Sequence, residues 1–387
     1  MNVTTHSVRL GDVADVQLGK MLSPAAQSGD LAPYLRNANI QWGTIELDDL
    51  ATMAFDEAER LKFALRKGDL LVCEGGEPGR CAVIDKELEG IYFQKALMRV
   101  RVNAEKLNVR YLQHYMQYAA AKGLFKKDGN QATIAHFPAV RLNGMLVPLP
   151  LLGQQERIAA ILDRADTIRR KRKQAIALTE QLLRSTFLEM FGDPVTNPKA
   201  WPTATLGSVA DVNRGKFSPR PRNDPRFYGG NFPFIQTGDI RRATGYLREW
   251  TQTLNEDGIE VSRGFGRGAI AISIAANIGD TAIVDYDFYC PDSVVCIEAT
   301  SNTVTPEYLE MVLRFYKPFL LALAPETAQK NINLETLRPL AIPEPTVSLA
   351  TFSALYRRVY QLQKTLTQQA ATDEQLFNAL VSQAFAH

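Results

Sequence analysis

Two long stretches of the chain place apolar residues three and four positions apart, which is the spacing of one face of a helix. The first runs from about 154 to 190 and the second from about 348 to 386, and neither contains an internal Pro or Gly. A helix of about 37 residues would be about 55 Å long, too long to pack inside one small domain. We therefore expect the two apolar faces to pack against each other as an antiparallel coiled coil. Its predicted contact residues are Ile158, Ile161, Leu162, Ile168, Leu182, Leu355, Val359, Leu362, Leu366, Phe377 and Leu380. The alternative is two separate core helices in independent domains.

The segments between these helices have shorter patterns. Strand-like runs separated by Gly-rich turns occur at 69–73, 81–85 and 97–102, and again at 269–274, 281–285 and 294–297. Helical patterns follow at 109–122 and 306–314. These patterns predict an α+β fold for each globular part.

The two halves of the chain are copies of one unit. Residues 10–20 recur at 206–216 with eight of eleven positions identical, and the segment 131–134 recurs at 329–332. Because these matches keep their order along the chain, we infer a tandem duplication of a unit of about 190 residues. The expected organisation is a globular part at 1–150, a helix at 151–192, a second globular part at 193–345 and a second helix at 346–387. Antiparallel helices would then relate the two globular parts by a pseudo-twofold axis.

Composition excludes several classes of protein. Hydrophobic residues make up 45% and charged residues 22% of the chain, as in ordinary globular proteins. The net charge is only +2, so any basic surface must be local. The four cysteines form no C-x-x-C pair, which argues against a zinc site and for reduced thiols. We expect a cytoplasmic protein, because the N-terminus lacks a signal-peptide pattern and no apolar run is long enough to span a bilayer.

We find no catalytic motif in the sequence. The glycine-rich segment 75–79 lacks the Lys-Ser/Thr of a P-loop, and no G-x-G-x-x-G or G-x-S-x-G is present. The four histidines form no metal-binding pair. A non-catalytic protein with no cofactor of its own is therefore expected, and the rival interpretation is a nuclease or methyltransferase with an unrecognised motif.

Local clusters of basic and amide side chains suggest contact with nucleic acid, because Lys and Arg bind phosphates while Arg, Asn and Gln read base edges. The alternative for any single member is a solvated loop residue. A further basic run lies at 164–173. It fits three interpretations: an exposed face of the helix, a surface that lines the back of a DNA spacer, or a contact with another subunit. The candidate DNA-binding residues are Lys20, Arg36, Asn37, Arg80, Lys95, Lys126, Lys127, Asn130 and Gln131 in the first copy, and Arg214, Lys216, Arg220, Arg222, Arg241, Arg242, Gln329, Lys330 and Asn331 in the second.

This organisation resembles the specificity subunits of type I restriction–modification systems. The resemblance covers essentially the whole chain and is carried by the repeated 10–20 segment, the Lys/Arg-Gly step before a glycine turn, the Gln-x-x-Ile segment and the 149–156 sequence LPLLGQQE. It implies that each globular part is a target recognition domain that reads one half of a bipartite double-stranded DNA site, and that the helices set the spacing.

The resemblance also implies partners: two methyltransferase subunits that bind S-adenosylmethionine, and restriction subunits that use ATP and Mg²⁺. The second helix begins without the Gln-Gln-Glu of the first, so the two methyltransferase contacts are expected to be unequal. Divergent recognition domains imply an asymmetric DNA target. The alternative is a coiled-coil scaffold protein without DNA binding.

Overall fold

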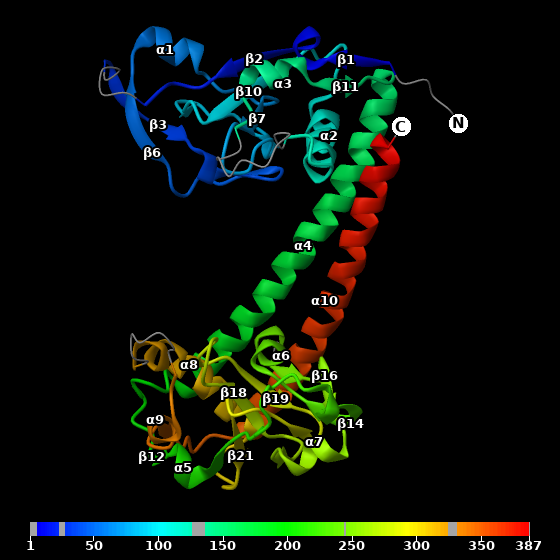
Figure 1. Cartoon of the computed structure of the whole chain (residues 1–387). Helices are drawn as coiled ribbons and strands as arrows, with labels where there is room; N and C mark the ends of the chain where they lie inside the picture. Colours follow the sequence, from blue (N-terminus) through cyan, green and yellow to red (C-terminus); the bar gives the residue numbers. More distant parts are fainter. Residues whose placement is uncertain (1–5, 23–27, 126–135, 244, 324–330, 387) are drawn as a thin grey trace. The chain divides into compact units, whose positions relative to one another are not determined.

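The computed structural model describes residues 6–22, 28–125, 136–243, 245–323 and 331–386. The chain divides into two compact units (Figure 1). Unit 1 comprises Met1–Lys171 and Ala370–His387, and unit 2 comprises Arg172–Gln369. Each unit is a mixture of helices and strands, which confirms the α+β prediction.

Unit 1 is built on two sheets, the antiparallel sheet β2-β10-β7-β8 and the smaller sheet β6-β3-β9. The strands are β1 (Ser7–Arg9), β2 (Ala14–Leu18), β3 (Asp30–Leu35), β4 (Ile40–Gln41), β5 (Thr44–Ile45), β6 (Ala51–Phe55), β7 (Leu70–Cys73), β8 (Cys81–Val83), β9 (Tyr92–Phe93), β10 (Leu97–Val102) and β11 (Leu146–Pro148). The helices are η1 (Leu10–Asp12), η2 (Asn37–Asn39), α1 (Glu57–Lys62), α2 (Val109–Ala121) and α3 (Ala139–Gly144).

Unit 2 repeats this plan with the sheets β13-β21-β18-β19-β15 and β16-β14-β20-β17. The strands are β12 (Thr203–Thr205), β13 (Ala210–Arg214), β14 (Tyr228–Phe234), β15 (Tyr246–Leu247), β16 (Gln252–Leu254), β17 (Gly264–Phe265), β18 (Ile270–Ser273), β19 (Thr281–Val284), β20 (Phe288–Tyr289), β21 (Val294–Ala299) and β22 (Ala341–Pro343). The helices are α5 (Leu206–Val209), η3 (Pro225–Phe227), α6 (Thr237–Arg242), α7 (Glu256–Glu260), α8 (Pro306–Leu323) and α9 (Leu334–Leu337).

Equivalent contacts hold the two copies in the same fold. The Tyr111 hydroxyl donates to the Pro148 carbonyl at 3.0 Å in unit 1, and the Tyr308 hydroxyl donates to the Pro343 carbonyl at 2.8 Å in unit 2. In both cases the tyrosine anchors the helix after the sheet to the Pro-x-Pro strand before the long helix. The internal repeat seen in the sequence is therefore a repeat of tertiary structure.

The two predicted long helices are α4 (Leu152–Phe191) and α10 (Leu349–Phe385). They contact each other within each unit and run antiparallel there. In unit 1, Arg169 of α4 forms an ion pair with Glu374 of α10 at 2.8 Å, and its guanidinium lies 4.4 Å from the centre of the Phe377 ring. In unit 2, Gln363 of α10 donates a hydrogen bond to Glu180 of α4 at 3.4 Å.

The helix contact is narrower than the predicted apolar stripe. Leu162, Val359 and Phe377 are buried, and Ile158, Leu355, Leu366 and Leu380 are half-buried. However, the side chains of Ile161, Ile168, Leu182 and Leu362 are 46–50% exposed. Two packed helices cover only a narrow strip of each other, so apolar residues on both sides of that strip stay in contact with solvent. Polar residues occupy part of the strip instead, including buried Asp166, Thr179 and Gln363.

Aromatic residues at the helix ends complete each core. Phe385 at the end of α10 packs on Tyr111 and Tyr115 in unit 1, with ring centres 5.2 and 5.4 Å away. Phe187 near the end of α4 packs on Tyr308 and Phe352 in unit 2, at 5.6 and 5.4 Å. No helix of the described residues is long and apolar enough to cross a membrane.

Phe187→Ala should destabilise unit 2 by about 3–5 kcal/mol, because it removes a fully buried ring at the centre of an aromatic cluster. Leu178→Ala, on the exposed side of the same helix, is the control and should cost little. Thermal unfolding followed by calorimetry measures both. Equal shifts of the two variants would contradict the assigned role of Phe187.

Candidate nucleic-acid interface

The chain leaves β3 in unit 1 and β14 in unit 2, both interior strands of the smaller sheet, in the same way. In unit 1 the chain leaves β3 at Arg36, whose backbone N–H donates to Asn39 Oδ1 at 2.9 Å as η2 begins. In unit 2 it leaves β14 toward Gln236, whose N–H donates to Asp239 Oδ2 at 2.8 Å as α6 begins. Arg36 and Gln236 therefore occupy the same position in the repeated fold, with different side chains.

In unit 1, four polar residues meet at this position, and we call them the unit 1 polar cluster: Arg36, Asn37, Glu77 and Arg80. Asn37 Nδ2 donates to the Gly75 carbonyl at 3.0 Å, and Arg80 Nη2 donates to the Asn37 carbonyl at 2.9 Å. Arg80 also pairs with Glu77 at 3.1 Å. Within the described residues, the buried atoms Arg36 Nε, Asn37 Oδ1 and Arg80 Nε have no hydrogen-bond partner. The cluster therefore contains buried polar atoms that the described residues leave unsatisfied.

Unit 2 gathers its predicted basic residues in two places. Arg241 Nη1 donates to Asn277 Oδ1 at 3.1 Å, at the position that corresponds to the unit 1 polar cluster. Elsewhere, Arg222 pairs with Asp292 at 2.6 Å and Arg220 lies 3.8 Å from the same carboxylate, while Arg214 Nε donates to the Asp292 backbone carbonyl. Three guanidinium groups gather around Asp292, two at its carboxylate and one at its backbone carbonyl, and leave an excess of positive charge. Exposed pairs of this kind exchange readily with phosphate.

The other predicted residues differ in accessibility. Lys95, Lys216 and Arg242 are exposed, and Arg242 pairs with Asp239. Asn331 is exposed and forms an isolated bridge with Ala275. The remaining predicted residues, Lys126, Lys127, Asn130, Gln131, Gln329 and Lys330, lie outside the described residues.

Lys20 does not have the geometry of a phosphate ligand. Its side chain is 3% exposed, and its ammonium group donates to Glu59 Oε2 at 2.5 Å and to the Ala54 carbonyl at 2.7 Å. The sequence suggested an accessible cation, but the glycine before it lets the chain approach β9 closely, and the lysine turns into the interior. In unit 1, the Gly-Lys step of the repeat therefore stabilises the folded structure of the unit and is not part of an exposed binding surface.

Sequence reasoning missed Gln236, which lies two residues after the end of β14, and Gln252, which begins the neighbouring strand β16. Gln252 is directly opposite Phe234 in the β14–β16 ladder, and the two amide side chains are hydrogen-bonded to each other. A signal was present in the sequence, because Pro33 and Ile40 recur as Pro233 and Ile240 at an offset of 200, which aligns Arg36 with Gln236.

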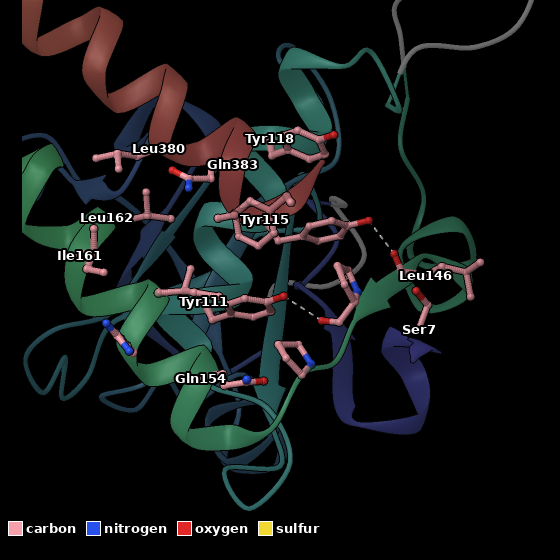
Figure 2. Close-up of a pocket in the computed structure, with 16 residues that line it drawn as sticks. Ser7, Tyr111, Tyr115, Tyr118, Leu146, Gln154, Ile161, Leu162, Leu380 and Gln383 are labelled. Atoms are coloured by element: carbon pink, nitrogen blue, oxygen red, sulfur yellow. Dashed lines mark hydrogen bonds between the residues drawn. The ribbon is translucent and has the colours of Figure 1, made fainter. Parts of the chain in front are cut away.

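An apolar groove of about 810 Å³ in unit 1 lies between α2, the start of α4 and the end of α10 (Figure 2). The hydroxyl groups of Tyr111 and Tyr115 donate to the carbonyls of Pro148 and Leu146, which line the same groove, and burial raises the pKa of both phenols. In unit 2, residues 192–202 connect the end of α4 to β12 and pack against the end of that helix. There the Trp201 indole donates to the Phe191 carbonyl at 2.8 Å, and Lys199 Nζ donates to the Met190 carbonyl at 3.0 Å.

The model of the type I restriction modification DNA specificity domain matches this chain twice, over residues 2–178 and 198–369. The chain therefore belongs to the type I restriction–modification DNA specificity family. The two matches correspond to the two copies of the repeat.

Relatives of known name are distant in sequence. The provisionally named type I restriction enzyme MjaX specificity subunit of Methanocaldococcus jannaschii is 22% identical over 339 residues, covering 81% of this chain and 76% of that protein. The type I restriction enzyme EcoBI specificity subunit of Escherichia coli is 22% identical over 312 residues, covering 71% of this chain and 63% of that protein.

Two solved structures share the fold over nearly the full length. The type I restriction–modification S subunit from M. genitalium has a TM-score of 0.58 and 14% identity, covering 99% of this chain and 94% of that one. A chain from work on complex assembly and conformational transition of the type I R-M system has a TM-score of 0.53 and 20% identity, covering 99% and 98%.

Lys20→Met should lower the stability of unit 1 by at most about 3 kcal/mol, because it leaves Glu59 without its cation while 24% of the glutamate side chain still reaches water. The exposed Lys95→Met is the matched control and should leave thermal unfolding unchanged. An unchanged melting temperature for Lys20→Met would show that Lys20 does not contribute to the stability of unit 1.

Proposed function

We propose that this chain is the DNA-sequence-specificity subunit of a type I restriction–modification complex and performs no catalysis itself. On this proposal 1–150 and 193–345 are target recognition domains, each reading one half of a bipartite asymmetric site in double-stranded DNA. Residues 151–192 and 346–387 are the spacer helices. The observation that carries the proposal is the repeated strand-end position, where one frame presents Arg36 in unit 1 and Gln236 in unit 2.

Partner subunits would supply the chemistry. Methyltransferase subunits would bind S-adenosylmethionine and methylate adenine, and restriction subunits would use ATP and Mg²⁺. The exposed Ile161 and Ile168 on α4 and the apolar groove of unit 1 support docking of a methyltransferase subunit, since exposed apolar surface favours protein contact. In unit 2, Lys199 and Trp201 cover the end of α4. This difference between the units supports unequal docking of two such subunits.

The direct test is methylome sequencing of cells that express this chain with its cognate methyltransferase subunit, compared with cells that lack this chain. We expect adenine methylation in a two-part motif with a fixed gap, only when the chain is present. Unchanged methylation would favour the scaffold alternative. A DNA shift assay would then decide, because a scaffold without DNA binding would give no salt-dependent shift.

Removing one heptad from both helices should shorten the gap of the recognised site. Deleting 172–178 together with 364–370 removes paired segments, because Arg172 bonds to Gln369 and Glu180 to Gln363. Seven residues span about 10.5 Å, which corresponds to about three base pairs. The methylome reports the new gap, and an unchanged gap would refute the role of the helices as a ruler. A substitution pair on the exposed helix face, Leu178→Ala with Leu362→Ala, is the control and should leave the gap unchanged.

A further inference from the structure

A concavity of about 330 Å³ on unit 2, which we call the amide pocket, has the chemistry of a base-reading site. Its polar lining comes from Gln236, Gln252, Asn223 and Arg222, and Tyr228 and Phe217 contribute aromatic surface. The Tyr228 hydroxyl donates to the Arg222 carbonyl, and burial raises the pKa of this phenol more than nearby Arg222 lowers it. The backbone of the Arg222 loop is thus tied to β14, while the Arg222 side chain remains 49% exposed.

The two glutamines form an amide pair in which Gln236 Nε2 donates to Gln252 Oε1. The pair uses one donor and one acceptor, so Gln236 Oε1 and Gln252 Nε2 have no partner among the described residues. If both amide groups were rotated, the free acceptor and free donor would simply exchange residues. The pair therefore presents one acceptor and one donor in either orientation.

This arrangement matches one base edge. In the major groove, adenine offers the N6 amino donor beside the N7 acceptor, whereas guanine offers two acceptors, O6 and N7. We propose that the amide pocket of unit 2 binds the major-groove edge of one adenine in its half-site, with the Gln236–Gln252 pair as the reading group. This inference rests on the proposed function. It specifies which base is read, which residues read it and which unit's half-site contains it.

Unit 1 has a different reading group at the same place. Arg36 replaces Gln236, and its Nη2 pairs with Asp49 Oδ2 at 2.8 Å. A guanidinium presents donors only, which is the pattern that suits guanine. The shared frame therefore makes the residue at this position exchangeable, and Gln236→Arg should change the preferred base from adenine toward guanine.

The experiment uses the full chain with its cognate methyltransferase subunit. Wild-type complex should bind a duplex carrying the recognised site about 10- to 100-fold more tightly than one with the contacted adenine replaced by guanine, which corresponds to about 1–3 kcal/mol. The contacted position is identified by scanning every base pair of both half-sites. Gln236→Leu and Gln252→Leu should remove the discrimination at one position of one half-site, and Gln236→Arg should reverse it there.

Two controls separate this inference from other failures. Arg222→Gln should weaken binding to all duplexes without changing the motif, because the exposed Arg222 at the edge of the pocket contacts phosphate in this scheme. Asn302→Ala, at an exposed amide of the same unit outside the pocket, should leave affinity and motif unchanged.

The outcomes are distinct. A wild-type chain without a two-part motif would refute the proposed function itself. A wild-type motif that persists unchanged in both glutamine variants, or that changes in the other half-site, would refute the amide pocket alone. If a variant gives no methylation in cells, thermal unfolding and duplex binding decide: intact unfolding with unchanged adenine-over-guanine preference overturns the inference.

Discussion

The structure depends on apolar contacts in which a helix that begins in one unit closes the core of the other. Phe187 and Phe191 of α4 lie among the buried residues of unit 2, and Phe377, Val381 and Phe385 of α10 lie in the core of unit 1. Each such ring removes a large apolar area from water, and edge-to-face contacts between rings add about 0.5–1.5 kcal/mol each. The long helices are therefore structural parts of both units as well as connections between them.

A fixed interior leaves the exposed strand ends free to vary. The ladders β2–β10 and β13–β21 pair corresponding residues, such as Val16 with Val100 and Val212 with Ile297. Beyond them, the residue at the N-cap position of the helix after the strand is arginine in one copy and glutamine in the other. Backbone hydrogen bonds define the position of each side chain, whereas its chemistry depends on a single residue.

The repeat, the long helices and the strands β7, β8, β10, β18, β19 and β21 of the two larger sheets could be predicted from the sequence, because periodicity and duplication are local or tandem signals. The other strands were not predicted. The site was predicted only in part. Lys20 was assigned to the surface because a pattern shows residue type but not the direction of a side chain. Ile161 and Leu362 fit the helical stripe, yet both are about half exposed, since the width of a helix contact is set by packing. Gln252 belongs to the site only through its strand partner, and strand pairing is not visible in a linear pattern.

The division of α10 between the units also determines the order in which they are completed. Unit 2 consists of one continuous segment, Arg172–Gln369, and all of its core residues have been synthesised once that segment has emerged. Unit 1 lacks Phe377, Val381 and Phe385 until the last turns of α10 are made. During translation, unit 1 therefore buries its core after unit 2, and Tyr111 and Tyr115 wait for Phe385 until the last turns of α10 have been synthesised.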